Sequence, residues 1–316
     1  MRMDVNNPTG DTGLIAIDKR GSRAFFLDPL SFDEITSLGL PARPHEVAIS
    51  ADHRRAFVSI YGNGIYGNNT QPGCTIVVLD LAAHAQVGTL DVSPYLAPHG
   101  LAFGADGLLY ASCDQSGVIA VLDVSSGSVL GAIDAGSHGP HMIAMLPDGS
   151  KLYSENEEDP FVSVMSPASR KRVRSVPMEG GSAGISASAD GRAVLVVGGQ
   201  EPVVSVIDTA SDTLVRSVHL DGHHQPAQRV RCSPNGRFVV VTATDEPLVT
   251  LLPADLASQT TLQVHAAPMG VAFHPNGRTA LVGNHGAGRI TVIDLESHAI
   301  ERDFACGVGV ETLAFY

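Results

Sequence analysis

The sequence predicts an all-β fold, a seven-bladed β-propeller with four-stranded antiparallel blades, closed by a C-terminal strand that completes the N-terminal blade. Three observations predict it. A segment recurs every 41 to 54 residues, each repeat holds four short strand-like runs, and the two chain ends each hold part of one unit. A single domain over residues 1–316 accommodates the whole pattern.

The repeat is marked by a short segment that opens the first strand of each unit, in its clearest form proline-histidine, an apolar run and an aspartate. It occupies Pro44–Asp52, Pro98–Asp106, Pro140–Asp148, Ser182–Asp190, Ala227–Asn235 and Pro268–Asn276. Its second position therefore falls at 45, 99, 141, 183, 228 and 269. The longest interval holds an insertion from Tyr61 to Gly73, which we interpret either as a lid over the channel or as an excursion without function.

Each repeat segment is followed by a turn and three further strands. The turn is most often Asp-Gly or Asn-Gly, a strong hairpin signal. A β-branched run follows, such as Arg237–Thr242, then a third strand that ends on aspartate, such as Val203–Asp208, and a fourth, such as Thr213–Val218. Four short strands at this period are typical of a propeller blade.

The chain ends predict ring closure. The chain begins partway through a unit, with Leu14–Asp18 as a second strand and Arg23–Asp28 as a third. It finishes with Val310–Phe315, a first strand without its sequel, which puts Glu311 in the repeat frame 42 residues after Met269. Pairing the two ends completes a seventh blade and removes two exposed sheet edges.

The repeat pattern resembles the YVTN-type β-propeller repeats over nearly the whole chain. It consists of Pro-His-Gly, an apolar strand, Pro-Asp-Gly and a strand that ends in Val-Ile-Asp. The resemblance implies the propeller fold, and similar seven-bladed folds serve lactonases, muconate-cyclising enzymes and virginiamycin B lyase. Ala183, Gln228 and Met269 depart from the pattern, because they stand where the first three complete repeats have histidine.

The composition limits the kinds of partner that the protein can bind and indicates its cellular compartment. A formal net charge of −13 argues against nucleic acid and anionic membranes, and the one dense basic run, 170–174, is expected to be a solvated outer-strand face. The four cysteines lie far apart, so we expect free thiols. Without a visible signal peptide or membrane span, we expect a soluble cytoplasmic protein, or a periplasmic one if a leader was removed. The oligomeric state is open, a monomer included.

The residues that open the innermost strands are expected to form a ring around one mouth of the central channel. In blade order they are Glu311, His45, His99, His141, Ala183, Gln228 and Met269. The glutamate and the three histidines fall in four consecutive blades, and together they supply the donors of a divalent transition-metal site for zinc, iron or manganese. The alternative is that each histidine only caps its own strand.

Further polar residues are expected on the same face, in the connections between second and third strands. Glu155 lies beside His141 and is a candidate to orient that histidine or to act as a general base, or else it is a solvated loop carboxylate. His285 in blade 7 is the second candidate catalytic residue. His223 and His224 also point to this mouth but are more typical of a flexible surface loop.

Two functional hypotheses follow. The first is a metal-dependent enzyme acting on a small polar organic substrate at the channel mouth, either a hydrolase of the lactonase or esterase kind or a lyase. The second is a non-catalytic propeller that binds a protein, a peptide or a metal ion through the same face. The fold alone does not choose between them.

Overall fold

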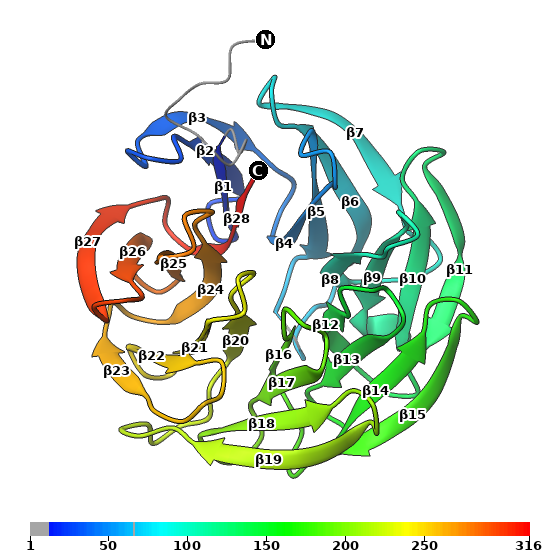
Figure 1. Cartoon of the computed structure of the whole chain (residues 1–316). Helices are drawn as coiled ribbons and strands as arrows, with labels where there is room; N and C mark the ends of the chain where they lie inside the picture. Colours follow the sequence, from blue (N-terminus) through cyan, green and yellow to red (C-terminus); the bar gives the residue numbers. More distant parts are fainter. Residues whose placement is uncertain (1–12, 66) are drawn as a thin grey trace.

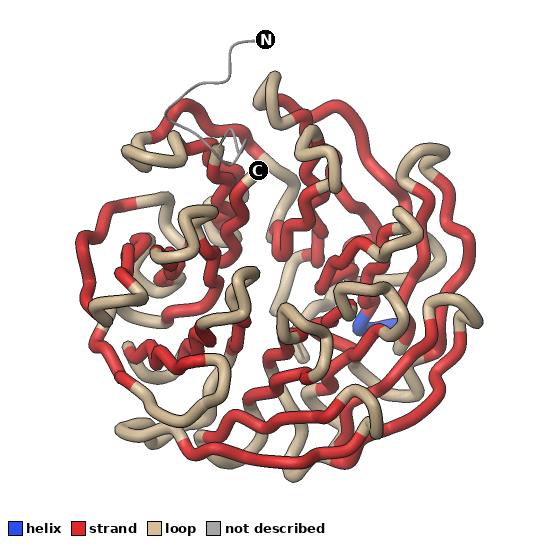
Figure 2. The backbone as a smooth tube through the Cα atoms, in the orientation of Figure 1, coloured by secondary structure: helices blue, strands red, loops and turns tan. Residues whose placement is uncertain are grey.

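The computed structural model describes residues 13–65 and 67–316 and shows seven four-stranded antiparallel sheets arranged in a ring (Figure 1). In the described residues the regular structure is almost entirely strand (Figure 2), and the one helix is the short 3-10 helix η1 (Asp114–Ser116). The predicted fold class is confirmed, including the four-stranded blades and the shared blade that closes the ring.

The blades follow the chain in order. Blade 1 contains β28 (Val310–Phe315), β1 (Leu14–Asp18), β2 (Arg23–Leu27) and β3 (Glu34–Gly39). Blade 2 contains β4 (Pro44–Ile49), β5 (Arg55–Gly62), β6 (Pro72–Asp80) and β7 (Ala85–Asp91). Blade 3 contains β8 (Pro98–Phe103), β9 (Leu109–Cys113), β10 (Val118–Asp123) and β11 (Ser128–Asp134). Blade 4 contains β12 (Pro140–Met145), β13 (Leu152–Asn156), β14 (Phe161–Ser166) and β15 (Lys171–Pro177).

The last three blades repeat the same plan. Blade 5 contains β16 (Gly184–Ala187), β17 (Ala193–Val197), β18 (Val203–Asp208) and β19 (Thr213–His219). Blade 6 contains β20 (Arg229–Cys232), β21 (Phe238–Ala243), β22 (Leu248–Pro253) and β23 (Thr260–Gln263). Blade 7 contains β24 (Pro268–Phe273), β25 (Thr279–Asn284), β26 (Arg289–Asp294) and β27 (Ala299–Ala305).

The first strand of each blade lies at the centre of the ring and the fourth lies at the rim (Figure 1). The middle strands are buried on both faces, so they read as continuous apolar runs, whereas the outer strands are largely exposed. The basic run predicted to be solvated falls on such an outer strand, where the first four residues of β15 are exposed.

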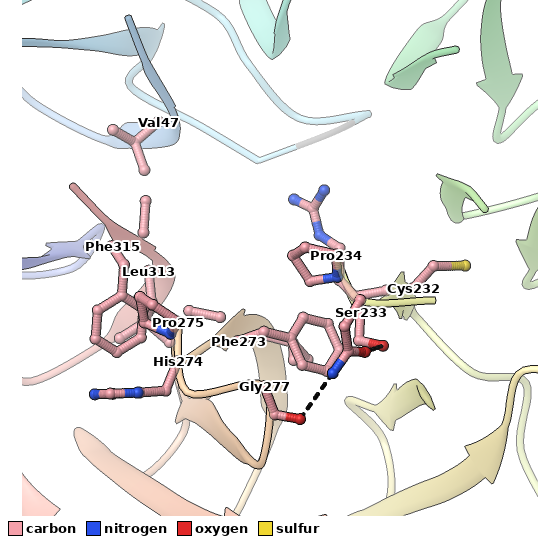
Figure 3. Close-up of a pocket in the computed structure, with 15 residues that line it drawn as sticks. Val47, Cys232, Ser233, Pro234, Phe273, His274, Pro275, Gly277, Leu313 and Phe315 are labelled. Atoms are coloured by element: carbon pink, nitrogen blue, oxygen red, sulfur yellow. Dashed lines mark hydrogen bonds between the residues drawn. The ribbon is translucent and has the colours of Figure 1, made fainter. Parts of the chain in front are cut away.

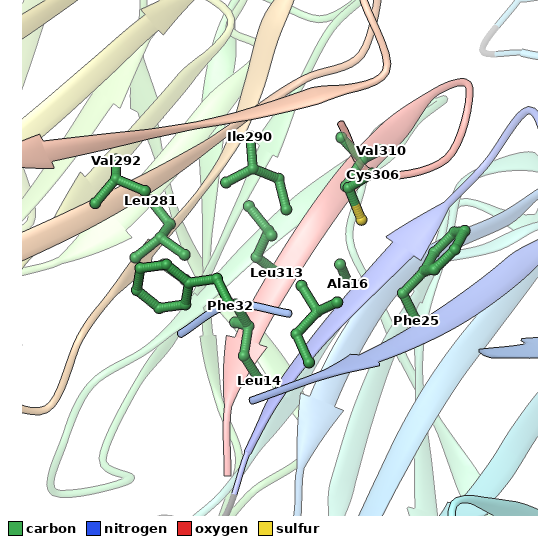
Figure 4. Packing of buried hydrophobic residues seen from close by; sticks show 12 residues of the cluster. Leu14, Ala16, Phe25, Phe32, Leu281, Ile290, Val292, Cys306, Val310 and Leu313 are labelled. Atoms are coloured by element: carbon green, nitrogen blue, oxygen red, sulfur yellow. The ribbon is translucent and has the colours of Figure 1, made fainter. Parts of the chain in front are cut away.

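Closure of the ring depends on β28, which pairs antiparallel with β1 so that Leu14 lies opposite Phe315. Backbone hydrogen bonds between Gly13 and Tyr316 extend the pairing by one residue. Leu313 packs with Leu14 and with Leu281 of blade 7 in one buried apolar cluster (Figure 4). The C-terminal strand therefore joins two blades as well as completing one.

Part of the insertion predicted in blade 2 extends the two flanking strands, so the loop itself is shorter than Tyr61 to Gly73. β5 continues to Gly62 and β6 begins at Pro72, and these two residues are paired. Asn69 ties the loop back to the sheet by donating from Nδ2 to the carbonyl of Tyr61. Tyr61 itself is buried, so it belongs to the core of the channel mouth, while Tyr66 lies outside the described residues.

Two other expectations concern the thiols and the membrane. All four cysteines are free thiols in the structure. None of the helical structure in the described residues is long and apolar enough to cross a membrane.

Candidate functional site

A β-bulge opens the innermost strand of five blades, namely blades 1, 2, 3, 4 and 7, and decides which side chains face the channel. In blade 2, Pro44 pairs with Ile60 and Val47 pairs with Val58, so His45 and Glu46 together oppose one residue of β5. A bulge interrupts the usual alternation of faces and re-aims side chains. The same shift follows Pro98, Pro140 and Pro268 in blades 3, 4 and 7.

Serine hydroxyls hold the bulges of neighbouring blades together. Ser59 Oγ accepts the backbone N–H of Glu46 at 3.1 Å and donates to the carbonyl of His99 at 2.8 Å. Ser112 repeats this one blade further, since it donates to the carbonyl of His141 at 2.5 Å. The backbones that carry two of the three histidines are therefore fixed by the preceding blade.

The three predicted histidines lie next to one another at one mouth of the channel, and we call them the histidine cluster (His45, His99, His141). The ring centroids of His45 and His99 are 3.8 Å apart, and those of His99 and His141 are 3.9 Å apart. The Tyr61 ring lies 5.5 Å from both His45 and His99. Burial lowers the pKa of His45 and of His99 well below the usual range, so both rings are neutral at physiological pH.

His99 is the central ring of the cluster and its most unusual member. It is 1% exposed, and within the described part of the chain neither of its ring nitrogens has a hydrogen-bond partner. A buried polar atom without a partner costs about 1–3 kcal/mol, so native proteins satisfy almost all of them. Two such atoms on one ring point to water, a ligand or a metal ion between the imidazoles.

Carboxyl groups surround His141. Its Nδ1 lies 2.6 Å from Glu155 Oε1, which also accepts the backbone N–H of Met142 at 2.7 Å, and 3.3 Å from Glu157 Oε1. Burial lowers the pKa of His141 to about 4 and raises the pKa of Glu155 to about 8. The contact engages Nδ1 and fixes the ring, so a ligand entering the cluster would meet Nε2.

A carboxylate and a lysine lie against His45. Glu311 Oε1 lies 3.1 Å from His45 Nδ1, and Lys19 Nζ lies 2.5 Å from His45 Nε2 and 3.3 Å from the same glutamate oxygen. Burial lowers the pKa of Lys19, although Glu311 opposes that effect. Burial alone would raise the pKa of Glu311, but its neighbours, His45 first and then Lys19 and Arg229, outweigh burial and hold that pKa below its usual value.

The atoms closest to a metal-binding arrangement belong to His45, Glu46 and His99. Among the described residues, the candidate ligand atoms of these three lie within 4.8 Å of one another. His141 and Glu311, the other two residues predicted as ligands, flank this group against His99 and His45. The structure therefore brings all four predicted ligands to one place and adds Glu46, while their role as metal ligands stays a prediction.

His285, the second predicted catalytic residue, lies at the edge of the cluster. Its Nδ1 donates to the carbonyl of Gly309 at 3.0 Å and lies 3.4 Å from Glu311 Oε2. Its side chain is 15% exposed, against 2–4% for Glu311 and His45. His223 does not join the cluster, because it bonds to Thr250 inside blade 6 at 2.7 Å.

Four buried or half-buried charged residues of the site are missing from the sequence prediction, namely Lys19, Glu46, Glu157 and Arg229. Lys19 follows the second strand of blade 1 just as His285 follows that of blade 7, and this shared position was the available signal. Glu46 is excluded by simple alternation and appears only because of the bulge. Arg229 Nη2 lies 3.8 Å from Glu46 Oε1, and its Nη1 donates to two backbone carbonyls.

Comparisons with known proteins support the architecture. No protein-family model matches the chain, and no curated protein sequence matches it. Among solved structures it is similar to hydrazine synthase from Kuenenia stuttgartiensis, with a TM-score of 0.72 and 18% identity over 86% of this chain and 89% of that chain. It is also similar to dihydro-heme d1 dehydrogenase NirN in complex with DHE, with a TM-score of 0.68 and 15% identity over 96% and 74%. Likeness at such identities shows the fold alone.

Proposed function

We propose that the chain is a metal-dependent enzyme that acts on a small polar organic substrate at the mouth of the channel that holds the histidine cluster. The reaction is hydrolysis of a lactone or ester, or a lyase step. The observation that carries the proposal is His99, a buried imidazole between two others with both ring nitrogens unpaired among the described residues. Two structural neighbours are named as a synthase and a dehydrogenase, so propellers of this shape do serve enzymes.

The donor set fits a divalent transition metal such as zinc, iron or manganese. Metal ligation requires neutral imidazole, and burial lowers the pKa of all three histidines. We assign His45, His99 and His141 as nitrogen ligands and Glu46 as the oxygen ligand. A bound ion of this kind supplies a Lewis acid and activates water.

Glu311 takes a different role from the one that its sequence position suggested, whereas Glu155 takes the orienting role that was one of its two candidates. Both lie against the Nδ1 atom of a histidine, at 3.1 Å and 2.6 Å, which is where carboxylates orient metal-binding imidazoles. We therefore propose them as positioning residues for His45 and His141. Glu311 remains the alternative oxygen ligand to Glu46.

His285 is the group that we assign to proton transfer. Because its Nδ1 donates to a backbone carbonyl, its Nε2 keeps a lone pair that can accept a proton. Burial lowers its pKa although Glu311 opposes that effect, so the ring is neutral and able to act as a base. Its partial exposure lets it pass a proton on to solvent, unlike the buried histidines.

The test is activity against a panel of lactones, carboxylic esters and β-substituted carbonyl compounds, with the protein stripped by a chelator and then reloaded with zinc, manganese or iron(II). The proposal expects activity that chelation removes and one metal restores. His99→Ala should abolish that activity, and His285→Gln should lower kcat more than metal content. Met269→Ala, at the same ring position in blade 7, is the matched control and should retain it.

A non-catalytic binding propeller is the second candidate, and Lys19 favours it. Its ammonium already lies against His45 and Glu311, so an internal cation neutralises part of the cluster. Under this alternative Lys19→Met should destabilise the fold and the wild type should hold no metal. Under the first proposal the same substitution should leave metal binding intact or strengthen it, because a competing cation is removed.

A further inference from the structure

The opposite mouth of the channel holds a cavity of about 700 Å³ that the proposed function does not use (Figure 3). Its wall is largely apolar and comes from the far ends of the innermost strands, with Val47, Phe273, Leu313 and Phe315 among its residues. Cavities of a few hundred to a thousand cubic ångströms with apolar walls and a few polar groups are the usual sites for small organic ligands.

The repeat frame explains why there is room. Three residues beyond the histidine ring, the innermost strands carry one small residue in every blade except blade 6. In blade order from blade 1, this second ring consists of Ala314, Ala48, Ala102, Ala144, Ser186, Arg231 and Ala272. Arg231 lines the large cavity and also a neighbouring one of about 270 Å³, which Ala144 and Ser186 line as well. Five of the six small residues, all except Ala48, thus line these two cavities together with Arg231.

Arg231 differs from its neighbours in the strand by lacking a side-chain partner among the described residues. In residues 13–65 and 67–316 no hydrogen bond or ion pair engages its guanidinium. Arg229, two residues earlier on the same strand, instead bonds to two carbonyls and faces Glu46. His274, which also lines the cavity, is occupied at both ring nitrogens by Asn276 and Pro29.

We propose that this far mouth binds a small apolar carboxylate. The guanidinium forms a two-pronged pair with a carboxylate, and one such pair neutralises a single negative charge without a second cation. The hydrocarbon or aromatic body packs against Phe273, Phe315 and Val47. The overall charge of −13 disfavours anions in general, so the attraction must come from the local charge of Arg231, whose guanidinium has no partner among the described residues.

The test is isothermal titration calorimetry at pH 7.5 and low salt with octanoate and 4-phenylbutyrate, and with 4-phenylbutyramide as the uncharged match. We expect saturable binding of at least one carboxylate at one site, and binding of the amide about tenfold to a hundredfold weaker. Arg231→Gln should weaken carboxylate binding by the same factor. Arg55→Gln, which removes an exposed arginine of β5 outside the cavity, should leave it unchanged.

A second variant separates the cavity from the charge. Ala314→Leu should fill the space and weaken the carboxylate and the amide alike, while leaving metal content at the histidine cluster unchanged. The proposal is overturned if neither carboxylate binds the wild type, if amide and carboxylate bind equally well, or if Arg231→Gln binds as the wild type does. None of these results bears on metal binding, so the two proposals stand or fall separately.

Discussion

The two ends of the channel are built from the same seven strands but differ in chemistry. At the polar mouth, four consecutive blades place Glu311, His45, His99 and His141 in contact, and every one of them is buried. At the far mouth, three residues further along each strand, the equivalent ring consists of five alanines, Ser186 and Arg231. One end is a closed polar cluster, and the other is an open apolar cavity with one charge.

The difference shows how a repeat protein can place two chemically distinct sites only three residues apart along each innermost strand. The framework positions, such as Val47 and Leu313, stay apolar in every blade because they pack between sheets. The ring positions line the channel, although Ala48, Ala144 and Ala272 of the second ring also pack in buried apolar clusters. The residue type at those positions differs from blade to blade, and each ring gives the channel a different character at its own depth.

The largest expected effect removes a strand that both ends share. Deleting residues 308–316 takes away β28, and with it Glu311 from the polar mouth and Leu313 from the apolar closure cluster. We expect loss of several kcal/mol of unfolding free energy, enough to leave the protein aggregated or unfolded at room temperature. Circular dichroism melting and gel filtration measure this, and an unchanged melting temperature would rule out closure by β28.

The next largest effect concerns the pH dependence of stability, which we expect to arise in part from Asp114 near the polar mouth. Asp114 accepts a hydrogen bond from Tyr61, and burial raises its pKa to about 6 from an ordinary value of 3.8. As pH rises, the unfolded chain loses this proton at a lower pH than the folded chain does. The free energy of unfolding therefore falls between pH 4 and pH 6, by about 3 kcal/mol in total, and stays constant above pH 6 as far as this group is concerned.

Urea titrations of wild type and Asp114→Asn across pH 4–7 isolate this group. The stability of the wild type relative to the variant should fall over that window and then level off. Tyr61→Phe removes a hydrogen bond that lowers the pKa of Asp114, so the fall should extend to higher pH. A pH-independent difference between wild type and variant would show that Asp114 is not held as the structure has it.

A smaller effect, on metal affinity, distinguishes a carboxyl group that orients a histidine from one that binds the metal directly. Glu155→Gln keeps the size of the side chain but replaces the carboxyl that lies against His141 Nδ1. Loss of such an orienting group weakens metal affinity by about tenfold to a hundredfold, without removing the metal altogether. Competition with a chromogenic chelator measures the affinity, and an affinity equal to the wild type would show that Glu155 has no such role.

The smallest effect concerns the half of the ring without histidines. Met269 occupies the same frame position in blade 7 and is only half-buried. Met269→Ala should cost about 1 kcal/mol of stability or less and leave metal affinity unchanged. A change in metal affinity comparable to that of Glu155→Gln would mean that the site extends around the whole ring.

The sequence was sufficient for the fold and for the position of the ring, because both follow from the repeat frame. His45, His99 and His141 share one frame position, and equivalent positions on neighbouring blades converge around the channel. Glu46 could not be found this way, because alternation along a strand assigns it to the opposite face unless a bulge is known. Arg229 lies one position beyond the ring, and only its geometry shows that it faces the same cluster.

Metal content measured by inductively coupled plasma mass spectrometry tests the central claim most directly. The protein is stripped with a chelator, offered zinc, manganese or iron(II), and freed of unbound metal by gel filtration. We predict about one ion per chain for the wild type and for Met269→Ala, and a sharp loss for His45→Ala, His99→Ala and His141→Ala individually. A wild type that retains none of the three metals, with the histidine substitutions lowering stability independently and additively, would contradict the account.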